Sequence, residues 1–182
     1  MNNNKSKTRK RNRLENYDYS SSGAYFITIC TNDRRNYFWD DVGATIGRPL
    51  PTNDYNNDNF IYHPQDVKLS EYGKIVDDAI NNIPEIYPTI SVDFYVIMPD
   101  HIHLILFIKT DEFGRPMVAP TISRVIQQMK GYVTKNIGVS IWQKLFHDHI
   151  IRNQHDYDQI VKYIYENPIR WNYDEIFSDK SH

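Results

Sequence analysis

The sequence predicts one α+β domain whose strands and helices follow one another in the order βαββαβ. Two kinds of segment lead to this prediction, because runs of β-branched and aromatic residues alternate with segments whose apolar residues recur at helical spacing. The length of 182 residues suits one domain of ordinary size with tails. A hydrophobic fraction of 40% is enough to form a packed core.

The first three elements are a strand, a helix and a strand. Residues 24–31 form a β-branched and aromatic run that ends at Asn32-Asp33, a pair typical of turns. Ser70 is a suitable N-cap for a helix that ends before Pro84, and residues 90–98 form the second strand. The helical segment carries its apolar residues on one face: Ile75, Val76, Ala79, Ile80 and Ile83.

The second half of the domain begins with a tight turn into a strand over residues 101–109, which pairs with its predecessor as a hairpin. Residues 122–136 show helical spacing, and residues 141–146 are the candidate for a fourth strand. A last helix covers residues 155–167 and ends before Pro168. This order predicts a ferredoxin-like fold, an antiparallel sheet with helices on one face, to which the last helix is added.

The charge is unevenly distributed along the chain. The net charge is −2, yet six basic residues and no acidic residue fall within the first fourteen positions. We therefore predict a flexible basic arm over residues 1–21, able to neutralise nucleic-acid phosphates, and a folded domain over residues 22–182. Within that domain, residues 41–66 are rich in Gly, Pro, Asn and Asp, and we predict a loop insertion there.

The cysteine content and the hydropathy pattern indicate the compartment. Cys30 is the only cysteine, which excludes an intrachain disulfide and favours a reducing environment. No apolar run approaches the roughly 18 residues of a membrane span, and the amino terminus lacks a signal-peptide core. These observations predict a cytoplasmic protein with no membrane partner.

A candidate site begins with His101 and His103. They are two residues apart in a predicted strand, so both imidazoles point to one face of the sheet, where they can share a metal ion. Leu104 and Leu106 have the opposite parity and would pack under the helices, which assigns the histidines to the open face. A His-x-His pair alone is a weak signal, because histidines at a strand start are more often hydrogen-bonded or exposed.

The last helix strengthens the case for a site. Tyr163 and Asn167 are four residues apart and therefore share one helix face. The helix can dock on the open sheet face and be anchored by Ile160, Val161 and Ile164. A phenol hydroxyl can attack a DNA phosphate and hold the strand covalently, so this arrangement favours phosphoryl transfer.

The same residues suggest a metal site. His101, His103 and Asn167 would supply two nitrogens and an amide oxygen, and would leave positions open for phosphate and water. That ligand set suits Mg²⁺ or Mn²⁺, and the histidines favour Mn²⁺. Zn²⁺ is less suitable, because structural zinc sites normally have four protein ligands. The cation would polarise the phosphate and neutralise charge in the transition state.

The residues themselves leave two alternatives open. Tyr132 competes with Tyr163 as a nucleophile, because composition does not separate them. His147 and His149 form a second alternating pair that could bind a metal, although no matched nucleophile follows them. The basic residues that could contact phosphates are Arg34, Arg35, Arg124, Lys130 and Arg152.

Four motifs occur in order along the chain: Met98-Pro-Asp-His-Ile-His103, Ile141-Trp-Gln143, His149-Ile-Ile-Arg-Asn153 and Tyr163-Ile-Tyr-Glu-Asn-Pro168. Together they resemble the REP-associated tyrosine transposases, over roughly residues 25–171. An ordered set of motifs is far more specific than any one of them. This family is similar to the single-tyrosine transposases of small insertion sequences, which have an HUH metal site.

The resemblance implies an enzyme that cuts and rejoins single-stranded DNA at the foot of hairpins formed by palindromic repeats. It implies a 5′-phosphotyrosine intermediate and a free 3′-hydroxyl. It also implies Tyr163 as the nucleophile, in preference to Tyr132, and Asn167 as the third metal ligand beside His101 and His103. Both monomers and homodimers occur in relatives of this architecture, and the sequence does not choose between them.

Two other functions also fit the residues. In a non-catalytic nucleic-acid-binding module, the sheet would hold DNA or RNA, and binding would be independent of metal and of Tyr163. A metal-dependent hydrolase would use water, leave no covalent adduct and retain cleavage after Tyr163→Phe. The placement of Tyr163 and Asn167 on one helix face favours the transposase over both.

Overall fold

The computed structural model describes residues 22–40, 68–109 and 121–178. The predicted basic arm and the predicted insertion at 41–66 lie outside these residues. Within the described ranges, no helix has the length and apolar character that crossing a bilayer would require. The helices and strands are, in chain order, β1 Gly23–Cys30, the 3-10 helix η1 Asn32–Arg34, α1 Glu71–Asn81, α2 Ile83–Ile86, β2 Ile90–Ile97, β3 His101–Ile108, α3 Ile122–Ile137, β4 His147–Ile151 and α4 Gln154–Ser178.

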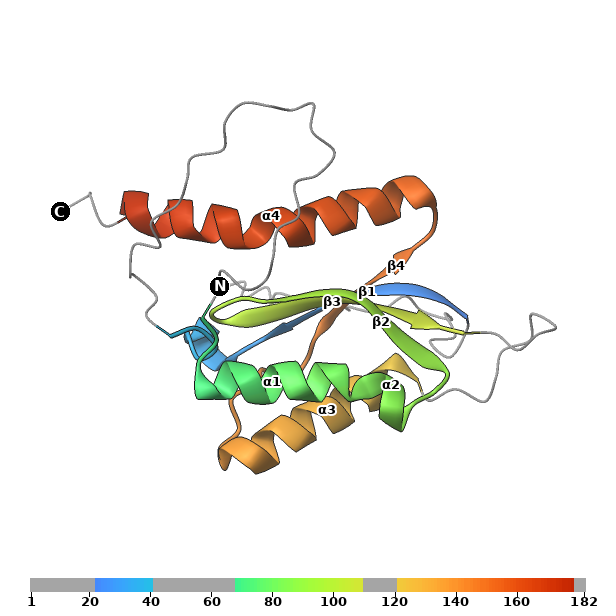
Figure 1. Cartoon of the computed structure of the whole chain (residues 1–182), viewed down its shortest axis with the longest axis horizontal. Helices are drawn as coiled ribbons and strands as arrows, with labels where there is room; N and C mark the ends of the chain where they lie inside the picture. Colours follow the sequence, from blue (N-terminus) through green and yellow to red (C-terminus); the bar gives the residue numbers. More distant parts are fainter. Residues whose placement is uncertain (1–21, 41–67, 110–120, 179–182) are drawn as a thin grey trace, which may run out of the picture.

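The four strands form one antiparallel sheet in the order β2-β3-β1-β4. Helices α1 and α3, with the short α2, cover one face of this sheet, and α4 crosses the other face (Figure 1). The predicted ferredoxin-like α+β arrangement is therefore confirmed, and α4 is the added helix. The sheet therefore lies between a layer formed by α1, α2 and α3 and a layer formed by α4.

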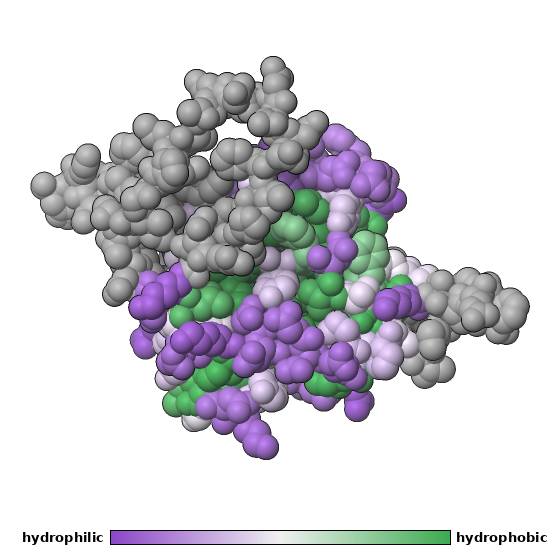
Figure 2. Space-filling view, viewed as in Figure 1, coloured by the Kyte–Doolittle hydropathy of each residue, from purple (hydrophilic) through white to green (hydrophobic). Residues whose placement is uncertain are grey.

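Local signals explain where the helices of the lower layer begin and end. The Ser70 side chain accepts a hydrogen bond from the backbone N–H of Gly73 at 3.1 Å, so α1 has the predicted N-cap. Thr121 has the same role for α3, which ends at Gly138 with a φ of 86°. That left-handed conformation suits glycine. The outer side of α1 is hydrophilic, and apolar residues show at the sheet edge between α1 and α4 (Figure 2).

The sheet has an apolar core on each face. Leu104 and Leu106 of β3 are fully buried in the larger core, which lies between the sheet and the helices α1 and α3. On the other face, Ile105 packs against Ile160 and Ile164 of α4. Alternation along β3 therefore directs its leucines to the helical layer and both of its histidines to the α4 layer, as the sequence predicted.

The predicted position of the fourth strand is wrong. The strand β4 covers His147–Ile151, and residues 141–146 form the connection that precedes it. Ile141 and Trp142 are buried in the larger core. The carbonyl of Ile141 accepts a hydrogen bond from the backbone of Asn32 at 2.8 Å. These two apolar residues fill the core from a connection, so their apolar character does not indicate a strand.

The predicted end of the last helix is also wrong, because α4 passes through Pro168 and continues to Ser178. A proline inside a helix removes one backbone hydrogen bond and costs roughly 3 kcal/mol. Pro168 is buried, and the ring of Trp171 beyond it lies 5.9 Å from that of His101. Packing of α4 along the sheet offsets the cost of the proline.

Candidate active site

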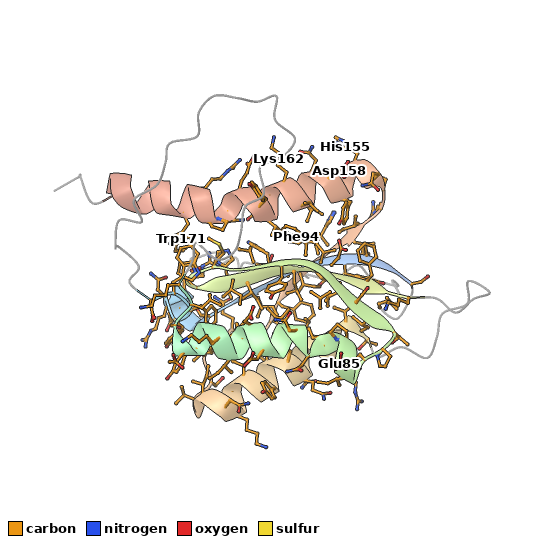
Figure 3. The ribbon with its side chains drawn as sticks, in the orientation of Figure 1. Glu85, Phe94, His155, Asp158, Lys162 and Trp171 are labelled. Atoms are coloured by element: carbon orange, nitrogen blue, oxygen red, sulfur yellow. The ribbon has the colours of Figure 1, made fainter. Side chains whose placement is uncertain are left out.

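A pocket lies between the sheet and α4, on the face that the sequence assigns to the histidines. Its walls come from β1, β3, β4 and α4, together with η1. Phe94 and Trp171 lie in the layer between α4 and the sheet, whereas Lys162 points away from it (Figure 3). The pocket residues that matter most for its chemistry are Arg34, His101, His103, Tyr163, Asn167 and Trp171.

Each histidine lies beside a hydrogen-bonding partner, one brought by strand register and one adjacent in the chain. The imidazole centroids of His101 and His103 are 4.6 Å apart. Thr28 of β1 lies opposite His103, and its Oγ1 is 2.8 Å from Nδ1 of that ring. Asp100 Oδ1 is 2.5 Å from Nδ1 of His101. Both rings therefore have Nδ1 engaged, which leaves Nε2 as the nitrogen that a metal would use.

The protonation state of His103 suits a metal ligand. Burial, followed by the charges of His101 and Arg34, lowers the pKa of His103 to about 3. The imidazole is therefore neutral at pH 7, which is the form that binds a cation. Its Nε2 is buried and has no hydrogen-bond partner in the described part of the chain. A buried polar atom without a partner is costly, so these residues fit a divalent cation.

The lowered pKa of His103 predicts that the metal-free protein loses stability in acid. The unfolded chain takes up this proton near pH 6.5, whereas the folded chain does so only near pH 3. The free energy of unfolding should therefore fall as the pH falls through this window, by up to about 1.4 kcal/mol per pH unit. Urea unfolding in EDTA at several pH values measures this slope. His103→Gln should have a shallower slope, and equal slopes in the two proteins would contradict the assignment.

Asp100 holds the histidine site in place. Its carboxylate is buried, with Oδ1 2.5 Å from Nδ1 of His101 and Oδ2 in an ion pair with Nε of Arg34 at 2.7 Å. Its backbone carbonyl accepts from the Thr31 hydroxyl at 3.0 Å. A carboxylate that is fixed in this way orients the imidazole and raises its basicity as a ligand.

We expect Asp100→Asn to weaken Mn²⁺ binding by about 10- to 100-fold, because an amide is a weaker acceptor for the imidazole of His101. Isothermal titration calorimetry with Mn²⁺ alone measures this effect. Asp40→Asn is the matched control, since Asp40 pairs with Lys68 outside the pocket. An unchanged Mn²⁺ affinity in Asp100→Asn would show that this carboxylate does not orient His101.

Tyr163 and Asn167 reach the pocket from successive turns of α4. The ring of Tyr163 lies 5.2 Å from that of His103 and 6.1 Å from that of Phe26, and the residue is 45% exposed. Nδ2 of Asn167 donates to the Tyr163 carbonyl at 3.4 Å, which leaves the amide oxygen for another ligand. Among the described residues no three His, Cys, Asp or Glu side chains form a metal cluster. A third protein ligand here would therefore be an amide such as Asn167.

Sequence reasoning missed three of the residues that shape the pocket. Asp100 stands directly before His101, so its position next to a candidate ligand was a usable signal. Thr28 meets His103 only through the register of two strands far apart in the sequence. Trp171 lies beyond Pro168, where the helix was expected to have ended.

The histidines of β4 have separate surroundings. His147 lines the pocket, whereas Nε2 of His149 lies 2.9 Å from a carboxylate oxygen of Asp156 at the start of α4. The hydrogen bond from His149 lowers the pKa of Asp156. His149 therefore links β4 to α4, whereas His147 faces the pocket, and a metal pair formed by these two histidines stays an untested alternative.

Only one of the five basic residues proposed for phosphate contacts, Arg34, lines the pocket. Arg124 and Lys130 belong to α3, on the opposite side of the sheet (Figure 1). The Lys130 ammonium donates to a backbone carbonyl at 2.7 Å, and burial lowers its pKa. Arg35 and Arg152 are exposed and lie outside the pocket lining. For all five basic residues, a contact with DNA stays a prediction.

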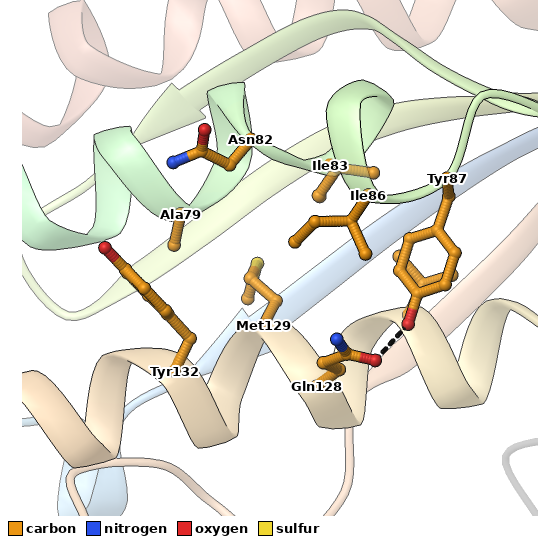
Figure 4. Close-up of a pocket in the computed structure, with 9 residues that line it drawn as sticks. Ala79, Asn82, Ile83, Ile86, Tyr87, Gln128, Met129 and Tyr132 are labelled. Atoms are coloured by element: carbon orange, nitrogen blue, oxygen red, sulfur yellow. Dashed lines mark hydrogen bonds between the residues drawn. The ribbon is translucent and has the colours of Figure 1, made fainter.

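A second pocket lies between α1, α2 and α3 (Figure 4). Its lining is mainly apolar and holds no charged or histidine side chain among the described residues, and the Tyr87 hydroxyl donates to the Gln128 amide oxygen. Tyr132 lines this pocket and is separated from the histidines by the sheet. The structure therefore places Tyr163, and not Tyr132, beside His103.

Several known proteins are similar to this chain, although no protein-family model matches it. A Haemophilus influenzae protein of unassigned function is 30% identical over 92% of this chain and 92% of its own length. A second H. influenzae protein, provisionally named a REP-associated tyrosine transposase, is 25% identical over 91% of this chain and 82% of its own length. The REP-associated tyrosine transposase of Escherichia coli K12 is 32% identical over 49% of this chain and 50% of its own length.

A solved structure shares the fold. A REP-associated tyrosine transposase bound to a REP hairpin superimposes with a TM-score of 0.56 and 24% identity. The match covers 87% of this chain and 73% of that protein. The common arrangement therefore includes most of the described sheet and helices.

Proposed function

The chain belongs to the REP-associated tyrosine transposases, and we propose that it cuts and rejoins single-stranded DNA beside hairpins through a covalent bond to Tyr163. The position of Tyr163 carries this proposal. Its ring lies 5.2 Å from that of His103, in the pocket that also contains His101 and Asn167. A nucleophile beside a candidate metal site is what phosphoryl transfer to a protein side chain needs.

In the proposed reaction, the hydroxyl oxygen of Tyr163 attacks the phosphorus of one phosphodiester. A bond forms between this oxygen and phosphorus, and the bond from phosphorus to the 3′-oxygen breaks. The tyrosine loses its proton to solvent, and the 3′-oxygen gains one. The products are a 5′-phosphotyrosine and a free 3′-hydroxyl. One phosphodiester replaces another, so attack by a 3′-hydroxyl can rejoin a strand without an external energy source.

His101, His103 and Asn167 are proposed to hold Mg²⁺ or Mn²⁺ through two imidazole nitrogens and one amide oxygen. When bound, the cation would polarise the phosphate and neutralise charge in the transition state. Thr28 and Asp100 keep the two imidazoles oriented for this role. The α4 helix presents Tyr163 to the same pocket.

The proposed substrate is single-stranded DNA that carries a hairpin. A transposase with the same fold has been solved with a REP hairpin bound, which supports this choice. The aromatic rings of Phe26 and Trp171 line the pocket and can stack on unpaired bases.

The formation of a protein-linked DNA strand tests the proposal. The protein is incubated with Mg²⁺ or Mn²⁺ and hairpin DNA from the flanks of its own gene, labelled at the 5′ end in one sample and at the 3′ end in another. A 5′-phosphotyrosine predicts that the 3′ label stays with the protein on a denaturing gel, while the 5′ label leaves on a shorter strand. EDTA should prevent both results.

The two alternative functions predict different gels. A metal-dependent hydrolase would shorten the DNA without a protein-linked strand. A binding module would retain the DNA in EDTA and would leave its length unchanged in metal. Either pattern would contradict the proposed transesterification.

A further inference from the structure

Arg34 has an unusual backbone at the edge of the pocket. Its φ is 55° and that of Asp33 is 54°, a left-handed conformation that is uncommon outside glycine. Such strain persists only where neighbouring contacts hold it. Here the backbone N–H and the hydroxyl of Thr31 both donate to the carbonyl of Asp100, at 2.9 and 3.0 Å. The turn is thus tied to the residue before the histidine strand, and Arg34 lines the pocket.

Two side chains fix the guanidinium group of Arg34 without using all of its donors. Nε lies 2.7 Å from Oδ2 of Asp100, and Nη1 donates to Sγ of Cys30 at 2.8 Å. The first contact is an ion pair and the second is a hydrogen bond, and together they involve two of the three nitrogens that carry the five N–H groups of an arginine. Nη2 has no partner among the described residues, and 49% of the side chain is exposed. The group is therefore held in place and still able to bind a ligand.

The charge around this guanidinium favours an anion. No Asp or Glu lines the pocket in the described part of the chain, and Arg34 is its one Arg or Lys. The Asp100 carboxylate is 3% exposed and lies between Arg34 and His101, so it balances charge without facing a ligand. An anionic phosphodiester is the substrate that the neighbouring Tyr163 is proposed to attack.

We propose that Arg34 binds the scissile phosphodiester of the single-stranded DNA, while Asp100 holds this guanidinium and the imidazole of His101 in a fixed relation. The inference rests on the proposed function, because it concerns the phosphate that Tyr163 attacks. A planar guanidinium can donate to a carboxylate from one edge and to a phosphate oxygen from another. Arg34 is then the residue that couples DNA binding to the orientation of the metal site.

The test measures the salt dependence of DNA binding in EDTA, so that it does not depend on cleavage. The probe is a fluorescein-labelled oligonucleotide that carries a hairpin and a single-stranded flank from DNA beside the chain's own gene. The proteins are the wild type, Arg34→Ala, Arg34→Lys and Lys135→Ala, and circular dichroism checks that each is folded. Lys135→Ala is the control, because Lys135 is an exposed cation of α3, on the other side of the sheet.

We expect Arg34→Ala to reduce the slope of log affinity against log salt concentration by about 0.7, the loss of one phosphate contact on a single strand. Arg34→Lys should keep the wild-type slope because it keeps the charge, and Lys135→Ala should also keep it. A wild-type slope in Arg34→Ala would overturn the inference. So would an equal reduction in Lys135→Ala, or a slope in Arg34→Lys as low as that of Arg34→Ala.

The same proteins separate this inference from the proposed function. Adduct formation is measured in parallel with Mn²⁺ and the same oligonucleotide. A wild-type adduct together with an unchanged slope in Arg34→Ala overturns the role of Arg34 and leaves the tyrosine reaction standing. A reduced slope without any wild-type adduct supports the phosphate contact and contradicts the proposed reaction.

Discussion

Tyr163→Phe is expected to abolish the protein-linked DNA strand, with a loss of at least about three orders of magnitude in rate. The substitution removes only the oxygen that would bond to phosphorus. It keeps the ring that packs beside Phe26 and His103, so the fold and DNA binding should persist. The measurement is the yield of labelled adduct over time on denaturing gels, at a protein concentration that saturates the DNA.

Tyr132→Phe is the matched control for this experiment. Tyr132 is 45% exposed, like Tyr163, but it lies in the pocket on the other side of the sheet. Its variant should form the adduct at the wild-type rate. An adduct that persists in Tyr163→Phe, or that disappears in Tyr132→Phe, would show that the nucleophile has been assigned wrongly.

His103→Gln is expected to lower metal-dependent cleavage by about 100-fold or more and to weaken Mn²⁺ binding to a similar degree. The change removes the buried Nε2 that lacks a partner among the described residues, and it removes the neutral imidazole beside Tyr163. Cleavage rates across a series of Mn²⁺ concentrations measure the effect. More Mn²⁺ should recover part of the lost rate if the variant binds the cation weakly.

His155→Ala provides the control, because His155 is exposed on α4 and lies outside the pocket lining (Figure 3). It should retain the wild-type rate and the wild-type Mn²⁺ affinity. If His103→Gln also retained both, His103 could not be a metal ligand, and the buried nitrogen would need another explanation.

The order of helices and strands was predictable because most elements carry their own pattern. Alternation along β3 assigned Leu104 to one face and both histidines to the other, and the structure confirms this. Prediction failed where packing overrides a local pattern. Ile141 and Trp142 are apolar because they fill the core from a connection. The α4 helix continues past Pro168, and Trp171 beyond the proline still packs beside His101 of the sheet.

The candidate site was predictable only in part, because its components differ in how far apart they lie in the sequence. His101 with His103, and Tyr163 with Asn167, are close enough for strand or helix spacing to place them on one face. The contact between Thr28 and His103 joins residues 75 positions apart and depends on strand register. Arg34 contacts Asp100 from a turn in which Asp33 and Arg34 both have a left-handed backbone conformation. No local sequence pattern predicted this conformation. The roles of the metal ligands and of the nucleophile stay predictions.

Identifying the residue that carries the DNA tests the tyrosine mechanism most directly. The adduct formed with Mn²⁺ is digested with nuclease and trypsin, and mass spectrometry locates the remaining 5′-nucleotide. We predict that it is attached to Tyr163. A nucleotide on Tyr132 or on any other residue, or cleaved DNA without a modified peptide, would contradict the central claim that Tyr163 forms the covalent bond.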